Sequence, residues 1–353
     1  MASPICVYPR PCVSKTVCIE DRVRDPRSNV TTEDEVLAAD LTAMLEVVEE
    51  RLLAAAVADS PFVTEASRHI ISAGGKRFRP MLVMLASAFG TEVANPEDLI
   101  KAALVVELTH VASLYHDDVM DDADLRRGAP SANRRWDNSI AIMVGDFLFA
   151  RASSTVATLG TDYVLLQAET FARLVQGQIA ETRGPQPGDD PLEHYLGVVA
   201  DKTGSLIATS AVFGGMVAAA EQSVLDALAK FGEEIGMVFQ LSDDIIDITS
   251  TATGKTPGTD LREGVPTLPT LMLKASTEPA DASLQALIAS DLRDDADLQR
   301  ALEGLRAHPV IERARSEIAR RADLALGYLS ELPSCAAKAA LEQITHDLVS
   351  RSS

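Results

Sequence analysis

Apolar residues recur every three or four positions along most of the chain, the spacing typical of amphipathic α-helices. The first such segment begins at Thr32, where Thr-Glu-Asp-Glu is typical of a helix start, and runs to Ala56. Similar segments span Pro80–Phe89, Pro96–Tyr115, Ser139–Ala157, Tyr163–Thr182, Gly204–Ala220, Gln222–Ile246, Leu284–Leu305, Pro309–Leu329 and Cys335–Val349. Glycine, proline and aspartate are frequent between them, and no segment alternates apolar and polar residues. The pattern predicts an all-α, bundle-like domain of about ten or more helices.

Residues 1–33 do not share this pattern. They carry three of the four cysteines and no apolar periodicity, which indicates a disordered tail or a misplaced start codon. Their start lacks the basic-then-apolar form of a secretory signal. No uninterrupted apolar run approaches the roughly 20 residues that span a bilayer. We therefore expect a cytoplasmic protein in which residues 34–353 form a single domain.

Composition narrows the classes of function. Aromatic residues make up 4% of the chain, which argues against a β-sandwich, a barrel or a base-stacking surface. The chain has 32 basic and 52 acidic residues and a net charge of −20, so we expect no nucleic-acid partner. A chain this acidic can still bind a polyanion when metal ions lie between them.

One carboxylate motif occurs twice. The first aspartate motif is Asp-Asp-Val-Met-Asp at 117–121, and the second is Asp-Asp-Ile-Ile-Asp at 243–247, with Gln240 one turn upstream. Residues i and i+4 of a helix lie within about 40° of each other, so their carboxylates repel unless a cation lies between them. Either motif alone could be a solvated acidic face. The second, however, lies in an otherwise apolar stretch, Met237–Ile248, and is expected to face a cavity.

This spacing suits Mg²⁺, which takes a few carboxylate oxygens and keeps water and substrate phosphates as its other ligands. Cations beside glycines could hold those phosphates, in Gly74–Pro80 (GGKRFRP), Lys202-Thr203-Gly204 and Gly254–Gly258 (GKTPG). Arg126-Arg127-Gly128 adds two guanidiniums that can bind phosphate through two hydrogen bonds each. A lysine beside a glycine is usually a solvated loop. Its repeated occurrence together with two aspartate motifs indicates a diphosphate site.

In this order the motifs resemble those of the trans-isoprenyl diphosphate synthases, or polyprenyl synthetase family. The matching segments are GGKRFRP at 74–80, HDDVMDDADLRRG at 116–128, GDFLFARA at 145–152, GQIAE at 177–181, KTG at 202–204, FQLSDDIID at 239–247 and GKTPGTDLREGVPTLP at 254–269. The likeness covers roughly residues 35–350. It implies an all-α isoprenoid-synthase-type bundle around a deep central cavity, usually assembled as a homodimer, with 34–353 as the catalytic domain.

The resemblance also implies a role for each matching residue. Three magnesium ions would be bound by Asp117, Asp121 and Asp243, with Asp118, Asp244 and Asp247 as supporting carboxylates. The allylic diphosphate would be held by Arg126, Lys202, Thr203, Gln240 and Lys255. Isopentenyl diphosphate would be held by Lys76, Arg79, His110 and Arg127, with Arg77 a flanking residue or bystander. Without the motif context, His110 would be interpreted as a core histidine.

The implied reaction condenses isopentenyl diphosphate head to tail with an allylic diphosphate, farnesyl or geranylgeranyl. Metal ions and cations neutralise the leaving pyrophosphate, so the allylic C–O bond breaks toward a carbocation that the isopentenyl double bond attacks. A proton is then lost to the departing pyrophosphate, and a dry cavity protects the cation from water. The chain departs from many relatives at Glu263-Gly264-Val265, where they carry a lysine. This changes the expected affinity for the allylic diphosphate but not the reaction.

Product length depends in this family on the residues four and five positions before the first aspartate. Here they are Ser113 and Ala112, both small, and the two-residue insertion of bacterial farnesyl-type enzymes is absent. One helical turn, about 5.4 Å, is close to the length of one isoprene unit. We therefore predict a long-chain all-trans polyprenyl diphosphate, with geranylgeranyl diphosphate as the alternative. Such a product would suit a quinone side chain and could draw the enzyme to a membrane surface.

Two other classes compete with this interpretation. A class I terpene cyclase also uses an aspartate-rich helix and Mg²⁺, but its second metal motif is of the Asn/Ser/Glu type and it has no use for an isopentenyl site. A non-catalytic subunit of a heteromeric synthase usually lacks one aspartate motif. Both motifs and GGKRFRP are intact here, which favours the synthase.

Overall fold

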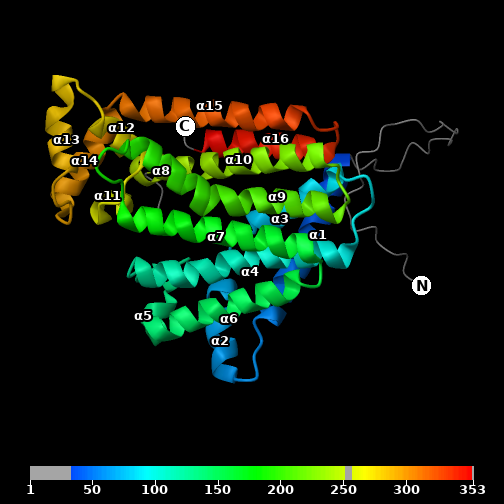
Figure 1. Cartoon of the computed structure of the whole chain (residues 1–353). Helices are drawn as coiled ribbons and strands as arrows, with labels where there is room; N and C mark the ends of the chain where they lie inside the picture. The colour runs from blue at the N-terminus through cyan, green and yellow to red at the C-terminus, as the bar shows by residue number, and fades with distance from the viewer. Residues whose placement is uncertain (1–32, 251–256, 352–353) are drawn as a thin grey trace, which may run out of the picture. The chain divides into compact units, whose positions relative to one another are not determined.

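The structure is a computed structural model that describes residues 33–250 and 257–351, and these residues are almost entirely helical. The α-helices are α1 (Glu33–Ala55), α2 (Pro61–Ser72), α3 (Phe78–Ala86), α4 (Pro96–Met120), α5 (Ala132–Trp136), α6 (Asn138–Val156), α7 (Thr161–Arg183), α8 (Pro191–Val199), α9 (Ser205–Val217), α10 (Gln222–Thr249), α11 (Thr259–Glu263), α12 (Leu268–Lys274), α13 (Ala282–Ile288), α14 (Asp295–Ala307), α15 (Val310–Ser330) and α16 (Ala336–Ser350) (Figure 1). Shorter elements are the 3₁₀ turns η1 (Ser87–Phe89) and η3 (Pro279–Asp281), the π-helical turn η2 (Ala200–Gly204), and the strands β1 (Leu125–Arg126) and β2 (Ala129–Pro130). The predicted all-α fold is confirmed.

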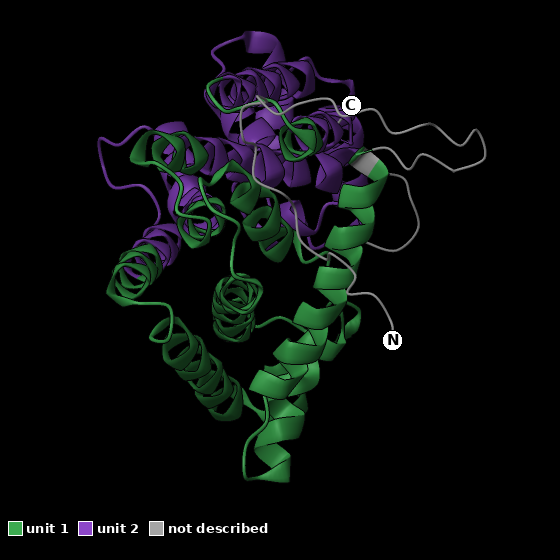
Figure 2. Cartoon of the chain, turned by 90° about the vertical axis from the view of Figure 1, so that its right-hand side faces the viewer, with its two compact units in different colours: residues 1–171, 209–229, 331–341 green, residues 172–208, 230–330, 342–353 purple. Residues whose placement is uncertain are grey.

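The chain divides into two compact units (Figure 2). Among the described residues, unit 1 comprises 33–171, 209–229 and 331–341, and unit 2 comprises 172–208, 230–330 and 342–351. The division falls inside α7, α9, α10 and α16. The tail predicted for residues 1–33 lies outside the described residues except for Glu33, which begins α1. The predicted domain 34–353 stays a prediction.

Unit 1 is built around α4, which packs on α6, α3 and α1 (Figure 1). The helix begins where the Asn95 side chain accepts hydrogen bonds from the backbone N–H groups of Glu97 and Asp98, with Pro96 in the first turn. Most of α4 is buried, on every face, so its sequence shows no amphipathic stripe. The first aspartate motif therefore lies at the end of a core helix.

Unit 2 contains the second aspartate motif, on the part of α10 that follows residue 229. One of its hydrophobic clusters joins the end of α10 to α11, α12, α13, α14 and α15, through residues such as Ile248, Leu273 and Leu305. Arg306 of α14 donates a 2.7 Å hydrogen bond to the carbonyl of Ile248 near the end of α10. The end of α10, directly after the second aspartate motif, therefore packs into a hydrophobic cluster of unit 2.

Most predicted helices are confirmed, and the corrections concern short elements. The segment predicted as one helix over 284–305 is two, α13 and α14, because Asp294 caps a new helix by accepting hydrogen bonds from Ala296 and Asp297 N–H. The prediction also missed α2, α5, α8, α11 and α12. Both α2 and α8 carry a usable signal, a capping Ser60 or Asp190 followed directly by proline.

Two helical stretches, Asn138–Val156 and Pro191–Val217, are long and apolar enough to cross a membrane by length and composition alone. The first contains Asp146 and Arg151, so it does not contradict the expectation that no uninterrupted apolar run spans a bilayer. The core helix of a soluble protein passes the same test, and 61% of the most apolar window in Pro191–Val217 is buried inside the protein. The two stretches are weak evidence for a membrane location.

Candidate active site

The first aspartate motif lies where α4 ends. Asp117 and Asp118 are in the last turn, and Asp121 is the C-cap, whose N–H donates to the Asp117 carbonyl at 2.8 Å. Asp122 follows with a left-handed φ of 49°, and the N–H of Ala123 returns to the Asp118 carbonyl at 3.0 Å. This is the hydrogen-bond pattern of a Schellman motif, which ends a helix sharply. The two predicted metal ligands of this motif are thus one turn apart on one helix.

Two residues beside the motif hold it in unit 1. The hydroxyl of Tyr115, which is fully buried, donates a 2.5 Å hydrogen bond to the Ala66 carbonyl on α2. On the neighbouring helix, a Cβ added to Gly145 would lie 2.3 Å from His116 Nε2 and 3.1 Å from the Ala112 carbonyl. Only glycine permits α6 to approach α4 this closely, which explains why GDFLFARA begins as it does.

Asp118 is buried and ion-paired. Its Oδ1 accepts a 2.6 Å hydrogen bond from Arg126 Nε and forms an ion pair with Nη2 at 2.6 Å, and its Oδ2 has no hydrogen-bond partner among the described residues. Burial raises the pKa of Asp118, while the Arg126 charge opposes the rise. Arg126, predicted to hold the allylic diphosphate, is therefore engaged with the motif itself here.

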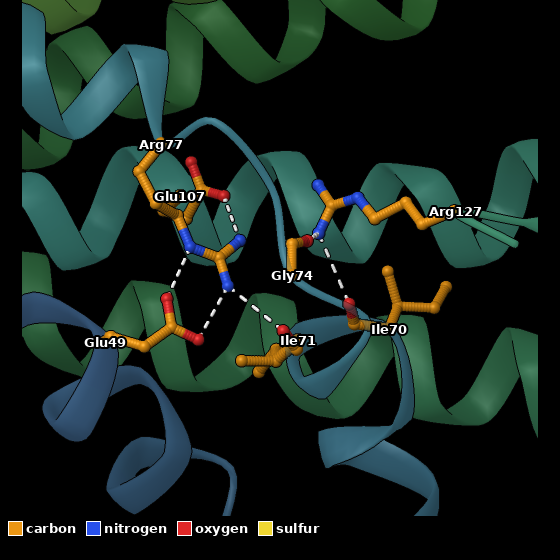
Figure 3. Close-up of polar contacts among 7 residues, drawn as sticks. All are labelled: Glu49, Ile70, Ile71, Gly74, Arg77, Glu107 and Arg127. Atoms are coloured by element: carbon orange, nitrogen blue, oxygen red, sulfur yellow. Dashed lines mark hydrogen bonds and ion pairs between the residues drawn. The ribbon is translucent and has the colours of Figure 1, made fainter. Parts of the chain in front are cut away.

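Arg126 and Arg127 lie on a tight hairpin. Strands β1 and β2 pair Arg126 with Ala129, so Arg127 and Gly128 form a two-residue loop with φ values of 54° and 79°. Type I′ hairpin turns require a positive φ at both positions. This geometry sends Arg127 toward the glycine-rich segment, where its Nη1 donates to the carbonyls of Gly74 and Ile70 (Figure 3).

Arg77, predicted as a flanking residue, has a structural partner set. Its buried guanidinium donates to both carboxylate oxygens of Glu49 on α1, at 2.6 and 2.8 Å, and to Glu107 on α4 at 2.9 Å (Figure 3). The burial cost of these charges is offset by mutual pairing, which ties the segment before α3 to α1 and α4. Arg77 thus holds the glycine-rich segment against α1 and α4.

Arg79 and His110 differ from Arg77 because neither has a carboxylate partner within the described chain. Burial lowers the pKa of Arg79 to about 10, and its buried Nε has no hydrogen-bond partner among the described residues. Burial also lowers the pKa of His110 well below its usual value, and the charges of Arg79 and Arg127 add to this. His110 is therefore neutral at pH 7. Lys76, the other predicted ligand in the glycine-rich segment, is exposed.

The two predicted chain-length residues lie on α4, one turn before the first motif. Ala112 is 1% exposed and Ser113 is 8% exposed, and the Ser113 hydroxyl donates to the His110 carbonyl at 2.8 Å. Val105, Leu108 and Thr109 are fully or almost fully buried one and two turns earlier on the same helix. The roles of Ala112 and Ser113 in chain length stay a prediction.

The second motif places three carboxylates in three environments. Asp243 Oδ1 lies 3.2 Å from Nη2 of Arg351, a residue just beyond α16 that the sequence did not indicate. Asp247 accepts hydrogen bonds from the N–H groups of Thr259 and Asp260 at 3.3 and 3.2 Å, the first residues of α11. A carboxylate there is favoured by the helix dipole. Asp247 therefore supports the start of α11, and its predicted role as a supporting carboxylate of the metal site stays a prediction.

Asp244 is fully enclosed by hydrogen-bond donors. Its Oδ2 accepts from the Tyr195 hydroxyl and from the Leu268 N–H at 2.9 Å, and its Oδ1 accepts from Gln240 Nε2 at 3.4 Å. Burial raises the pKa of Asp244 to about 7, although each of these donors opposes the rise. Gln240 therefore contacts the motif, as its position one turn upstream predicted, and Tyr195 of α8 is a partner that the sequence did not indicate.

Lys202 and Thr203 lie in the π-helical turn η2 between α8 and α9. Lys202 Nζ donates a 2.6 Å hydrogen bond to Glu181 of α7, the last residue of the GQIAE segment. Short π-helical turns inside longer helices are frequent at functional sites. Lys255, the remaining predicted ligand of the allylic diphosphate, lies outside the described residues.

The donor chemistry of the aspartates fits a hard divalent cation. Among the described residues no three His, Cys, Asp or Glu side chains are grouped to hold a metal ion. Mg²⁺ does not require such a cage, because it is commonly bound by one or two carboxylates plus water and substrate phosphates. Two observations are consistent with that kind of site. Asp117 and Asp121 lie one turn apart, and the buried Oδ2 of Asp118 beside them has no hydrogen-bond partner among the described residues.

Known proteins with similar sequences and structures place the chain. Residues 60–305 match the family model for polyprenyl synthetase. A nonaprenyl diphosphate synthase from Mycobacterium tuberculosis (strain ATCC 25618 / H37Rv) is 42% identical over 320 residues, 90% of this chain and 95% of that protein. A decaprenyl diphosphate synthase from Rhodobacter capsulatus superposes with a TM-score of 0.82 at 30% identity, over 91% of this chain and 99% of that chain.

A third likeness includes a bound ligand. The structure of geranylgeranyl pyrophosphate synthase from Corynebacterium glutamicum, complexed with calcium and isoprenyl diphosphate, superposes with a TM-score of 0.81 at 45% identity. The superposition covers 89% of this chain and 97% of that chain. Fold and sequence together define a trans-prenyltransferase with the all-α isoprenoid-synthase fold. The chain belongs to the polyprenyl synthetase family.

Proposed function

We propose that the protein elongates an allylic diphosphate, farnesyl or geranylgeranyl, with isopentenyl diphosphate in a Mg²⁺-dependent head-to-tail condensation. The observation that carries this proposal is a cluster of partly buried positive charge in unit 1 of an otherwise acidic protein. Arg79 and Arg127 have no carboxylate partner among the described residues, and Arg127 donates only to backbone carbonyls there. Burying an unpaired charge is costly, so such a cluster is expected to bind an anion.

A diphosphate is the anion that suits this cluster. Two guanidiniums can each bind phosphate oxygens through two hydrogen bonds, and the neutral His110 has one N–H to donate. Lys76 is exposed nearby in the sequence and can add a charge. We assign these four residues to isopentenyl diphosphate, as the family resemblance implies. The matching assignment for the allylic diphosphate is Arg126, Lys202, Thr203, Gln240 and Lys255.

Mg²⁺ is the proposed cofactor, with three ions bound by Asp117 and Asp121 of unit 1 and by Asp243 of unit 2. When bound, these ions would neutralise the pyrophosphate leaving group and so assist ionisation of the allylic substrate. The protein's own arginines and lysines would orient both diphosphates and stabilise the same charge. Asp118, Asp244 and Asp247 would keep the motifs in place through the hydrogen bonds described above.

The reaction is tested by mass spectrometry of products formed from Mg²⁺, labelled isopentenyl diphosphate and either allylic primer. Labelled polyprenyl diphosphates are expected. Hydrocarbon or alcohol formed from the primer alone would indicate a cyclase, and no turnover would indicate a missing partner subunit. Arg79→Gln and Arg127→Gln should raise KM for isopentenyl diphosphate more than KM for the primer. Arg134→Gln is the matched control, because Arg134 is exposed and already paired with Asp122 and Asp124.

For product length we propose a long-chain polyprenyl diphosphate, with geranylgeranyl diphosphate as the alternative. Small, buried Ala112 and Ser113 support the longer product, and relatives of both kinds are similar to this chain. Ala112→Phe should shorten the product by several isoprene units, since the new ring fills one turn of the helix. Ala112→Val is the milder variant that controls for overpacking. An unchanged product distribution in a folded Ala112→Phe protein would contradict the proposal.

We further propose a cytoplasmic homodimer that associates with membranes only through its lipid product. Exposed apolar side chains on two successive helices of unit 1 support a dimer, namely Ile142 and Met143 of α6 and Val164 and Leu165 of α7. Covering exposed apolar side chains with a partner removes them from water, which favours association. Light scattering should give twice the mass of 37.7 kDa, and a monomer would contradict this.

A further inference from the structure

The π-helical turn η2, which carries Lys202 and Thr203, packs against one face of α7. Arg173, Gly177 and Glu181 are spaced by four residues, so they form a single line along that helix. Each contacts the turn: Arg173 pairs with Asp201, Gly177 lies against the backbone of Asp201 and Lys202, and Glu181 accepts from Lys202. Residues from three consecutive turns of α7 therefore contact Asp201 and Lys202 of η2.

Glycines allow the backbones of unit 2 to approach closely at this turn. A Cβ at Gly177 would lie 2.8 Å from the Lys202 nitrogen, and a Cβ at Gly236 of α10 would lie 2.8 Å from the Gly204 Cα. Distances below 3.0 Å are not found for real Cβ atoms, so the turn fits between α7 and α10 only because these residues are glycines. Packing against these two glycines therefore restricts where the turn can lie.

Among the described residues of α7, Arg173 is the one side chain that forms ion pairs with both η2 and α10. Its Nε donates to Asp201 in the turn at 2.6 Å, and its Nη1 donates to Glu233 of α10 at 2.8 Å. Planar guanidinium is suited to hold two carboxylates in a fixed relation, which an ammonium group cannot do. The hydrogen bonds that Arg173 donates to Glu233 and Asp201 raise its pKa, so its charge is permanent.

We propose that Arg173 is a positioning residue for the allylic diphosphate: by fixing Asp201 against Glu233 it holds η2 so that Lys202 and Thr203 can bind the diphosphate. The inference rests on the proposed function and extends it to a residue outside the family motifs. All three side chains are about two-fifths exposed, at 38%, 38% and 40%, so water screens their attraction and the pairs add little to global stability. Their contribution is geometric.

The test compares Arg173→Gln, Arg173→Lys and a matched control, Arg321→Gln. Arg321 of α15 pairs with Glu234, the neighbour of Glu233 on α10, and with Glu317, but it does not contact the turn. Arg173→Gln should raise KM for the allylic diphosphate about tenfold, while KM for isopentenyl diphosphate and the thermal midpoint change little. Arg173→Lys should restore part of the loss, and Arg321→Gln should leave KM for both substrates as in the wild type.

Two further measurements separate the possible failures. Calorimetric titration with inorganic pyrophosphate and Mg²⁺ should show weaker binding to Arg173→Gln without any turnover. Asp201→Asn in the Arg173→Gln background should add almost nothing, because the pair acts as one unit. Identical kinetics for the Gln variants at 173 and 321 would overturn the positioning role. Wild-type protein that incorporates no labelled isopentenyl diphosphate would instead overturn the proposed function.

Discussion

The two aspartate motifs have the same spacing but different surroundings. The first ends a buried helix in a Schellman motif, and its middle carboxylate, Asp118, is paired with Arg126 eight residues later. The second lies within the long helix α10, and among the described residues its middle carboxylate, Asp244, accepts hydrogen bonds from uncharged donors alone. One motif is thus stabilised by a charge and the other by hydrogen bonds. Burial raises the pKa of both middle carboxyls, and at Asp118 the charge of Arg126 opposes that rise.

The residues upstream of the motifs differ as well. Ala112 and Ser113 precede Asp117 by five and four positions, whereas Val238 and Phe239 hold the same positions before Asp243. The Phe239 ring is covered by the guanidinium of Arg351 at 4.6 Å from its centre. The small pair leaves volume for a growing chain in the proposed function, and the aromatic residue anchors a cation. Equal spacing therefore does not imply equal tasks.

The largest expected effect is the loss of activity on removing a proposed metal ligand. Asp117→Ala should lower kcat by roughly a thousandfold or more, because charge on the leaving group would no longer be neutralised. Its unfolding transition should stay close to that of the wild type, since Asp117 is partly exposed. Asp124→Ala, an exposed carboxylate paired only with Arg134 in the described contacts, is the control and should retain activity. Comparable rates for both variants would contradict the metal assignment.

The second effect concerns the buried carboxyl of Asp244. Its pKa is about 7 in the folded protein and 3.8 when unperturbed, so the folded state holds a proton that the unfolded state has lost between these values. Stability contributed by this group is therefore present in acid and lost as the pH rises toward 7. Asp244→Asn should remove that loss and stabilise the metal-free protein at pH 8 by a few kcal/mol, on the order expected for such a shift.

Denaturant unfolding in EDTA at pH 5 and pH 8 measures this change. The same substitution at Asp118 provides the contrast, because the Arg126 charge opposes the rise in its pKa and is lost as a partner in Asp118→Asn. We expect a smaller gain, or a loss, at that position. If Asp244→Asn keeps the wild-type dependence on pH, the carboxyl is not titrating there.

The motifs themselves and most long helices could be predicted because they depend on local spacing. The helical period places Asp117 beside Asp121, and a turn upstream places Gln240 beside Asp244, without any knowledge of the fold. Tyr195 and Arg351 could not be predicted in this way, since they reach the second motif from 49 and 108 residues away. The structural role of Arg77 was also hidden, because its partners Glu49 and Glu107 lie on other helices.

His110 provides the opposite dependence on pH in the first region. Burial and nearby arginines hold its pKa well below 6.5, so acid protonates this histidine in the unfolded state before the folded state. Its contribution is present at neutral pH and is lost as the pH falls below about 6.5, by up to about 1.4 kcal/mol for each pH unit. His110→Gln should be less sensitive to acid than the wild type between pH 6.5 and 5.

The smallest effect concerns the cation beside each motif. Arg351 competes with a metal ion for Asp243, so Arg351→Gln should lower the half-saturating Mg²⁺ concentration by up to about fivefold, as expected for a partly exposed ion pair. The difference should shrink in high salt, which screens such pairs. Arg126→Gln should instead lower activity, because it removes both the partner of Asp118 and a proposed diphosphate ligand. If both variants lower activity, or both lower the half-saturating Mg²⁺ concentration, the two arginines have the same role.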